Sequence, residues 1–132
     1  MKDIDTQLFY QLKEVEERIS WIHTEIINLL DLDKKTYLEV LSFSSKQFKT
    51  NIFIDYVVNE KNKEIIEDLL NKGIIETYVG KRNKEFIRFT EYGTNLVNKI
   101  QELTIDLLSK YFGTLEVRDK KNFSLLLDKF LN

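Results

Sequence analysis

The sequence contains no cysteine and no proline, and it has only four glycines and a single histidine, His23. The absence of cysteine excludes disulfide bonds, thiolate nucleophiles and cysteine-ligated zinc sites. A lone histidine also excludes the two-histidine zinc motif of metalloproteases. Because proline is missing, the turns must be built from Gly, Asn and Asp.

Long apolar runs and catalytic signatures are missing as well. No run approaches the roughly 18 apolar residues of a membrane span, and the N-terminus lacks the apolar core of a signal peptide. We therefore expect a cytoplasmic protein without a membrane partner. The chain has no P-loop, no GxGxxG and no GxSxG motif, and neighbouring acidic residues such as Glu16 and Glu17 diverge on a helix. We expect neither catalysis nor a cofactor nor a metal site.

What the sequence does contain is typical of a globular protein. Its 132 residues, of which 42% are hydrophobic and 32% charged, suit one domain over residues 1–132 with a core of its own. The formal net charge is −2. A nucleic-acid-binding surface would therefore have to concentrate its positive charge locally.

Apolar residues at steps of three and four predict a long helix over residues 3–30. The stripe comprises Ile4, Leu8, Leu12, Val15, Ile19, Ile22, Ile26 and Leu29. It is wider than a small domain can readily cover with its own residues, which suggests a partner helix from a second copy of the chain. A final helix over residues 119–131 has a similar apolar face, and Asp119 is its expected N-cap.

Three shorter helices are predicted between residues 33 and 73. Asp33 is the expected N-cap of the first, which Ser44 and Ser45 should end. A second helix is predicted over "KQFKTNIFIDYV", residues 46–57, although the β-branched and aromatic residues there would also suit a strand. Asn59 should cap the third, which has a polar first half, an apolar second half and Gly73 at its C′ position.

Alternating apolar and polar residues then predict a β-hairpin over residues 74–90, followed by a helix over residues 91–112. The hairpin tip is cationic because it contains Lys81, Arg82 and Lys84. Such a tip is either merely solvated or built to contact a phosphate backbone. Arginine is the residue best suited to the second role, because its planar fork can bind phosphate with two hydrogen bonds.

Two short helices, a helix with a free polar half and a hairpin form a winged helix-turn-helix. With the flanking helices, this order resembles the MarR family, including its SarA-like members. The segments that carry the resemblance are "IIEDLLNKGIIE" and "FIRFTEYG". It implies a mainly α fold with a small β-hairpin (α+β). A winged helix-turn-helix lobe over 33–90, with its wing at 74–90, would be flanked by dimerisation helices at 3–30 and 91–131. The family's Asp-x-Arg tip signature is replaced here by Lys81, Arg82 and Asn83.

The resemblance also implies a function. Members of the family are homodimeric transcriptional regulators that bind double-stranded DNA, with the third helix in the major groove and the wing on the backbone. Our candidate DNA-binding residues are Lys46, Lys49, Thr50, Asn59, Lys61, Asn62, Lys63, Lys81, Arg82, Lys84 and Arg88. Our candidate dimer-interface residues are Leu8, Leu12, Ile19, Phe123, Leu126, Leu127 and Phe130. Family members often bind a small-molecule effector, but the sequence identifies none.

A second interpretation stays open from the residues alone. The third helix contains Glu60 and Glu64, which phosphates repel, although a glutamate can also accept a hydrogen bond from a cytosine amino group. Together with the altered tip, these acids favour a winged-helix module that binds another regulator and no DNA. Salt dependence separates the two interpretations, because binding to DNA weakens steeply with added salt.

Overall fold

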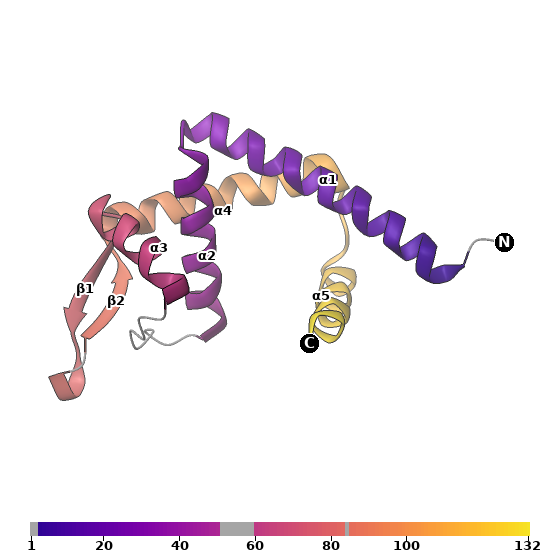
Figure 1. The fold of residues 1–132 in the computed structure, drawn as a ribbon. Helices are drawn as coiled ribbons and strands as arrows, with labels where there is room; N and C mark the ends of the chain where they lie inside the picture. The colour runs from indigo at the N-terminus through magenta and orange to yellow at the C-terminus, as the bar shows by residue number, and fades with distance from the viewer. Residues whose placement is uncertain (1–2, 51–59, 84) are drawn as a thin grey trace. The chain divides into compact units, whose positions relative to one another are not determined.

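The structure, a computed structural model, describes residues 3–50, 60–83 and 85–132. Its elements in chain order are α1 (Ile4–Leu30), α2 (Lys34–Thr50), α3 (Glu60–Asn71), β1 (Ile75–Val79), the 3₁₀ turn η1 (Lys81–Asn83), β2 (Glu85–Phe89), α4 (Glu91–Phe112) and α5 (Val117–Leu131). Figure 1 shows this arrangement. The predicted fold class, mainly α with one antiparallel hairpin, is confirmed. None of the helices described is long and apolar enough to cross a membrane.

The chain forms two compact units. The first unit consists of Met1–Ile22 together with Ile105–Asn132, and the second of His23–Thr104. Helices α1 and α4 therefore contribute to both units. The second unit contains the elements of the predicted winged helix-turn-helix lobe, whereas a single domain over residues 1–132 stays a prediction.

The core of the second unit is built from one apolar face of each helix and from the inner face of the hairpin. Its buried residues are Ile26, Tyr37, Val40, Phe43, Ile66, Leu69, Ile74, Ile75, Ile87, Leu96 and Ile100. The rings of Phe43 and Phe89 meet edge to face with centroids 4.9 Å apart, which ties α2 to β2. At the start of α2, His23 Nδ1 lies 2.6 Å from the hydroxyl of the buried Tyr37.

Helix α2 confirms one sequence prediction and corrects another. Asp33 caps it as expected, since its carboxylate accepts from the Thr36 backbone N–H at 3.2 Å. Ser44 and Ser45, however, do not end the helix, which continues to Thr50. Serine lowers helix propensity only slightly, and the buried Val40 and Phe43 hold the helix in place. The residues expected to continue the next short helix, 51–57, lie outside the described part.

The base of the hairpin is fastened to α4 by Thr90. Its backbone N–H donates to the carbonyl of Ile74 at 3.0 Å, and its hydroxyl donates to the carbonyl of Gly73 at 2.6 Å and accepts from the Gly93 N–H at 3.0 Å. Gly93 is required here because a Cβ at this position would lie 2.0 Å from the Ile74 carbonyl oxygen. The hairpin therefore leaves the helices at a fixed point.

The first unit holds the terminal helices. Arg18 of α1 donates to the carbonyl of Tyr111 at 3.0 Å, and the ring of Trp21 lies 5.8 Å from that of Tyr111. Helix α5 begins two residues earlier than predicted, with Glu116 at the N-cap position, so Asp119 lies in the first turn and is not the cap. A carboxylate in the first turn still complements the helix dipole.

Candidate nucleic-acid interface

Helix α3 ends in a tight turn that leads directly into the hairpin. The Ile74 N–H donates to the Leu69 carbonyl at 3.0 Å and the Gly73 N–H to the Leu70 carbonyl at 3.1 Å, which is the Schellman pattern. Gly73 has a φ of +70°, as its C′ position requires, so this prediction is confirmed. The buried Leu69 and Ile74 anchor the C-terminal end of the helix.

The predicted helical contact residues are only partly described. Lys63 is exposed on α3. Lys61 and Asn62 lie in the first turn of α3, and Asn59 and Lys84 lie outside the described residues. Lys46, Lys49 and Thr50 were expected at the start of a helix, but they lie in the last turns of α2. These three residues therefore do not lie at a helix N-terminus, where backbone N–H groups attract phosphate.

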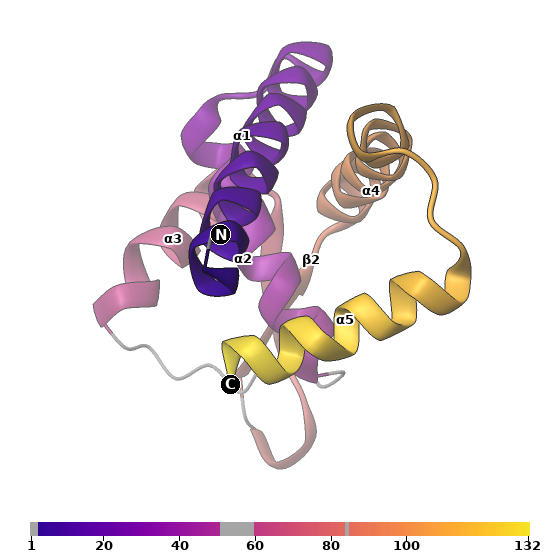
Figure 2. The same ribbon diagram turned by 90° about the vertical axis from the view of Figure 1, so that its right-hand side faces the viewer.

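The hairpin presents its cationic tip away from the helices of its unit. Figures 1 and 2 show β1 and β2 extending together from the end of α3 to a tip that stands clear of α2 and α3 in both views. Lys81 and Arg82 are exposed there. Arg82 and Asn83 have φ values of +64° and +56°, a conformation that asparagine tolerates and arginine seldom adopts. The tip thus keeps an arginine in a strained backbone conformation, which is a feature typical of functional sites.

The fourth cation predicted for the wing, Arg88, is held on the outer face of the hairpin. Its Nε donates to Glu76 at 3.1 Å, directly across the strand pair, and its guanidinium lies 4.5 Å from the centre of the Tyr78 ring. Tyr78 in turn stacks on Phe86, with centroids 5.6 Å apart. Arg88 is therefore already paired, whereas the exposed cations described at the tip are Lys81 and Arg82.

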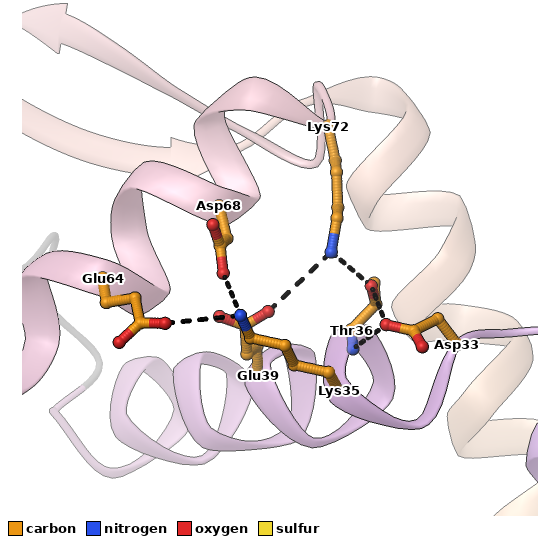
Figure 3. A network of polar contacts seen from close by, with 7 residues as sticks. All are labelled: Asp33, Lys35, Thr36, Glu39, Glu64, Asp68 and Lys72. Carbon is orange, nitrogen blue, oxygen red and sulfur yellow. Dashed lines mark hydrogen bonds and ion pairs between the residues drawn. The ribbon is translucent and has the colours of Figure 1, made fainter.

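A polar network joins α2 to α3, and sequence reasoning did not find it. Lys35 lies 3.3 Å from Glu64 and 3.1 Å from Asp68, two acids one turn apart on α3. We call this polar contact between α2 and α3 the seam. On its other side, Lys72 donates to the Thr36 hydroxyl at 2.5 Å. Figure 3 shows Lys35 reaching from α2 and Lys72 from the turn after α3. The seam fixes how α3 lies on α2.

Glu39 is the buried member of this network. Its side chain is 6% exposed, Lys72 Nζ lies 3.9 Å from its Oε1, and neither of its carboxylate oxygens has a hydrogen-bond partner within the described residues. Burial and, after it, the charge of Asp68 raise the pKa of Glu39, while Lys72 and Lys35 oppose the rise. Asp68 differs because the hydrogen bond from Lys35 lowers its pKa.

The raised pKa of Glu39 predicts a pH dependence of stability. A carboxyl group whose pKa is higher in the folded state stabilises the fold below its unfolded pKa, and this contribution is lost as the pH rises through the folded value. We expect Glu39→Gln to gain stability over the wild type above that value and to lose the advantage in acid. Urea unfolding at a series of pH values measures this. A difference that stays constant with pH would contradict the account.

The terminal helices expose the apolar residues predicted for a dimer interface. Leu8 and Ile19 of α1 and Phe123, Leu126 and Phe130 of α5 are exposed in the single chain. Leu12 and Leu127 are half-buried. No residue of α5 is buried at all. A 15-residue helix without buried residues is only marginally stable by itself in water, so this surface is suited to burial against a partner.

The structure also bears on metal binding and on the single histidine. Within residues 3–50, 60–83 and 85–132 there is no group of three His, Cys, Asp or Glu side chains that could hold a metal ion. His23, the only histidine, pairs with Tyr37, and burial lowers its pKa. The His23 ring is therefore part of the packing of the second unit.

No protein-family model and no curated protein matches this sequence, but solved structures match over nearly the whole chain. A MarR-family transcriptional regulator from Silicibacter pomeroyi superposes with a TM-score of 0.65 at 12% identity, covering 98% of this chain and 90% of its own. A mutant of MarR from E. coli gives 0.55 at 13% identity, covering 100% and 98%.

A third match is a complex with nucleic acid. A mutant of MepR from S. aureus, bound to an oligodeoxyribonucleotide, gives a TM-score of 0.52 at 14% identity, with coverage of 98% of this chain and 97% of the other. The chain thus has the fold of MarR-family transcriptional regulators, as the order of its elements predicted.

Proposed function

We propose that the chain is a homodimeric transcriptional regulator that binds double-stranded DNA in the cytoplasm. The observation that carries the proposal is the tip of the hairpin, where Lys81 and Arg82 are exposed on a support fastened at its base to α4. Phosphate contacts supply most of the affinity of such proteins and fix their position on the duplex. The fold, shared with a MepR mutant bound to an oligodeoxyribonucleotide, supports the same function.

In this proposal α3 enters the major groove and the tip lies along an adjacent backbone. The exposed Lys63 faces the DNA, and the first-turn residues Lys61 and Asn62 stay candidate contacts. Arg82 contacts a phosphate or enters a minor groove, where its planar guanidinium is favoured. Arg88 supports the tip from the outer face of the hairpin, through Tyr78.

The terminal helices make the dimer. The exposed apolar residues of α1 and α5 cover those of a second copy, which gives the complex twofold symmetry and predicts two half-sites in the DNA. Any effector molecule stays unidentified, and we propose no cofactor.

The experiment that tests DNA binding uses Arg82→Glu. We expect the variant to bind a mixed-sequence duplex at least about tenfold more weakly than the wild type at low salt, because a charge-assisted hydrogen bond is replaced by repulsion in both wings. Fluorescence anisotropy with a labelled duplex measures the affinities.

Two further variants separate the effect of the charge at Arg82 from an effect on folding. Lys99→Glu makes the same change of charge on an exposed position of α4 and should bind nearly as the wild type does. Arg82→Gly removes the cation but relieves the positive φ, so it should fold at least as well and still bind weakly. Equal affinities for all four proteins would contradict a DNA-contacting tip.

A second candidate function is a protein-interaction module that uses the same fold. The exposed Glu64 and Glu67 of α3 favour it, because they make the outward side of this helix acidic. It predicts no binding to DNA even at low salt.

A further inference from the structure

The acidic residues of α3 are not equivalent, and their difference bears on what the helix contacts. Ile66 and Leu69 are buried, which fixes the side of α3 that faces the core. Glu64, Glu67 and Asn71 lie toward the opposite side by helical geometry, and all three are exposed. A helix approaching a phosphate backbone with two free carboxylates on this side would be repelled.

Lys35 neutralises one of these two carboxylates. Its ammonium group lies 3.3 Å from Glu64 and 3.1 Å from Asp68, so a single cation from α2 serves two acids one turn apart. The pKa of Lys35 is raised and that of Asp68 lowered by this pairing. Both acids are thereby paired with a cation of α2.

No described cation neutralises the carboxylate of Glu67. It makes no hydrogen bond or ion pair within the residues that the structure describes, and its side chain is exposed. Lys63 precedes it by four residues, in the order that stabilises a helical ion pair less well. Of the acids on α3 whose side chains are described, Glu67 is thus the one that keeps a free carboxylate.

We propose that Glu67 is a specificity-determining residue, whose carboxylate accepts a hydrogen bond from the exocyclic amino group of a cytosine in the major groove. The inference rests on the proposed function, and it adds which chemical group on the DNA this helix selects. A carboxylate has only acceptors to offer, and cytosine N4 presents a donor in the groove. Phosphates, O6 and N7 of guanine and O4 of thymine present only acceptors to it, and the groove's other donor, adenine N6, lies beside the acceptor N7.

The consequence is a division of roles between two parts of the protein. The tip of the hairpin supplies affinity that does not depend on sequence, because it contacts phosphates. Glu67 lowers the affinity for duplexes that present no amino group at the matching position, since the carboxylate then loses water without gaining a donor. Its net effect is selectivity at some cost in affinity.

The test compares Glu67→Gln with Glu64→Gln, which makes the same change one turn away on an acid that Lys35 already holds. Each protein selects duplexes from a randomised library, and anisotropy then measures binding to the selected duplex and to single-base variants. We expect the wild type and Glu64→Gln to prefer cytosine at one position of each half-site by about fivefold or more. Glu67→Gln should shift this preference toward adenine, whose N6 and N7 match an amide, and bind mixed-sequence DNA more tightly than the wild type.

The outcomes separate this inference from the function on which it rests. Wild-type binding together with an unchanged preference in Glu67→Gln would overturn the role of Glu67 and leave the DNA-binding function intact. A wild type that selects no duplex would overturn both. Circular dichroism spectra of the two variants should match the wild type, because both substitutions replace exposed side chains by isosteric ones.

Discussion

The Gly93→Ala variant is expected to be less stable than the wild type by about 3 kcal/mol or more, the range of overpacked and strained backbone sites. The added Cβ would lie 2.0 Å from the carbonyl oxygen of Ile74 and 3.0 Å from Cδ1 of Phe89. The carbonyl cannot move away freely, because it accepts a hydrogen bond from the Thr90 backbone N–H. The start of α4 must therefore separate from the base of the hairpin.

Helix propensity alone predicts that Gly93→Ala makes the protein more stable. Alanine in a helix is favoured over glycine by about 1 kcal/mol, so the measured sign decides which effect dominates. Gly73→Ala is the control: its positive φ disfavours alanine by about 1 kcal/mol, but nothing lies within 4 Å of the new Cβ. Urea unfolding followed by circular dichroism measures both variants. A Gly93→Ala protein as stable as the wild type would show that Ile74 does not lie against this helix.

The Leu126→Asp variant is expected to dissociate into single chains. Leu126 is exposed in the single chain, so the change leaves the fold of that chain unaltered. In the proposed dimer it would bury an unpaired carboxylate in each copy, at several kcal/mol apiece. The dissociation constant should therefore rise by at least about 100-fold. Sedimentation equilibrium over a range of protein concentrations measures it.

Leu38→Asp is the matched control for this experiment. Leu38 is an exposed leucine of α2 and does not belong to the proposed interface, so the same substitution there should leave the dimer intact. A monomeric wild type, or a Leu126→Asp dimer as tight as that of the wild type, would show that α5 is covered in some other way.

Most elements of the fold could be predicted from the sequence, because they depend on local patterns. The periodicity of α1 and α4, the glycine after α3 and the alternation in the hairpin each specify their element within a few residues. Helix α2 was predicted to end too early because the tendency of Ser44 and Ser45 to break a helix is weak. The packing of Phe43 against Phe89, far along the chain, outweighs it.

The polar seam between α2 and α3 could not be predicted in the same way. Lys35 and Glu64 are 29 residues apart, and no local pattern pairs them. Glu39 looks like any charged position of an amphipathic helix, since only the position of α3 buries it. By contrast, the stacking of Tyr78 on Phe86 could have been found from the strand alternation, which places both on the outer face once the register is known. The contact residues of the candidate interface stay predictions.

The measurement that tests the central claim most directly is the salt titration of the wild-type chain on a mixed-sequence duplex, the reference for Arg82→Glu. We expect binding at low salt whose association constant falls steeply as salt is added. The log–log slope should become shallower by about one for each phosphate that a variant no longer neutralises. Two chains should bind each duplex at saturation. No binding even at low salt, or binding indifferent to salt, would contradict a DNA-binding regulator and favour a protein partner.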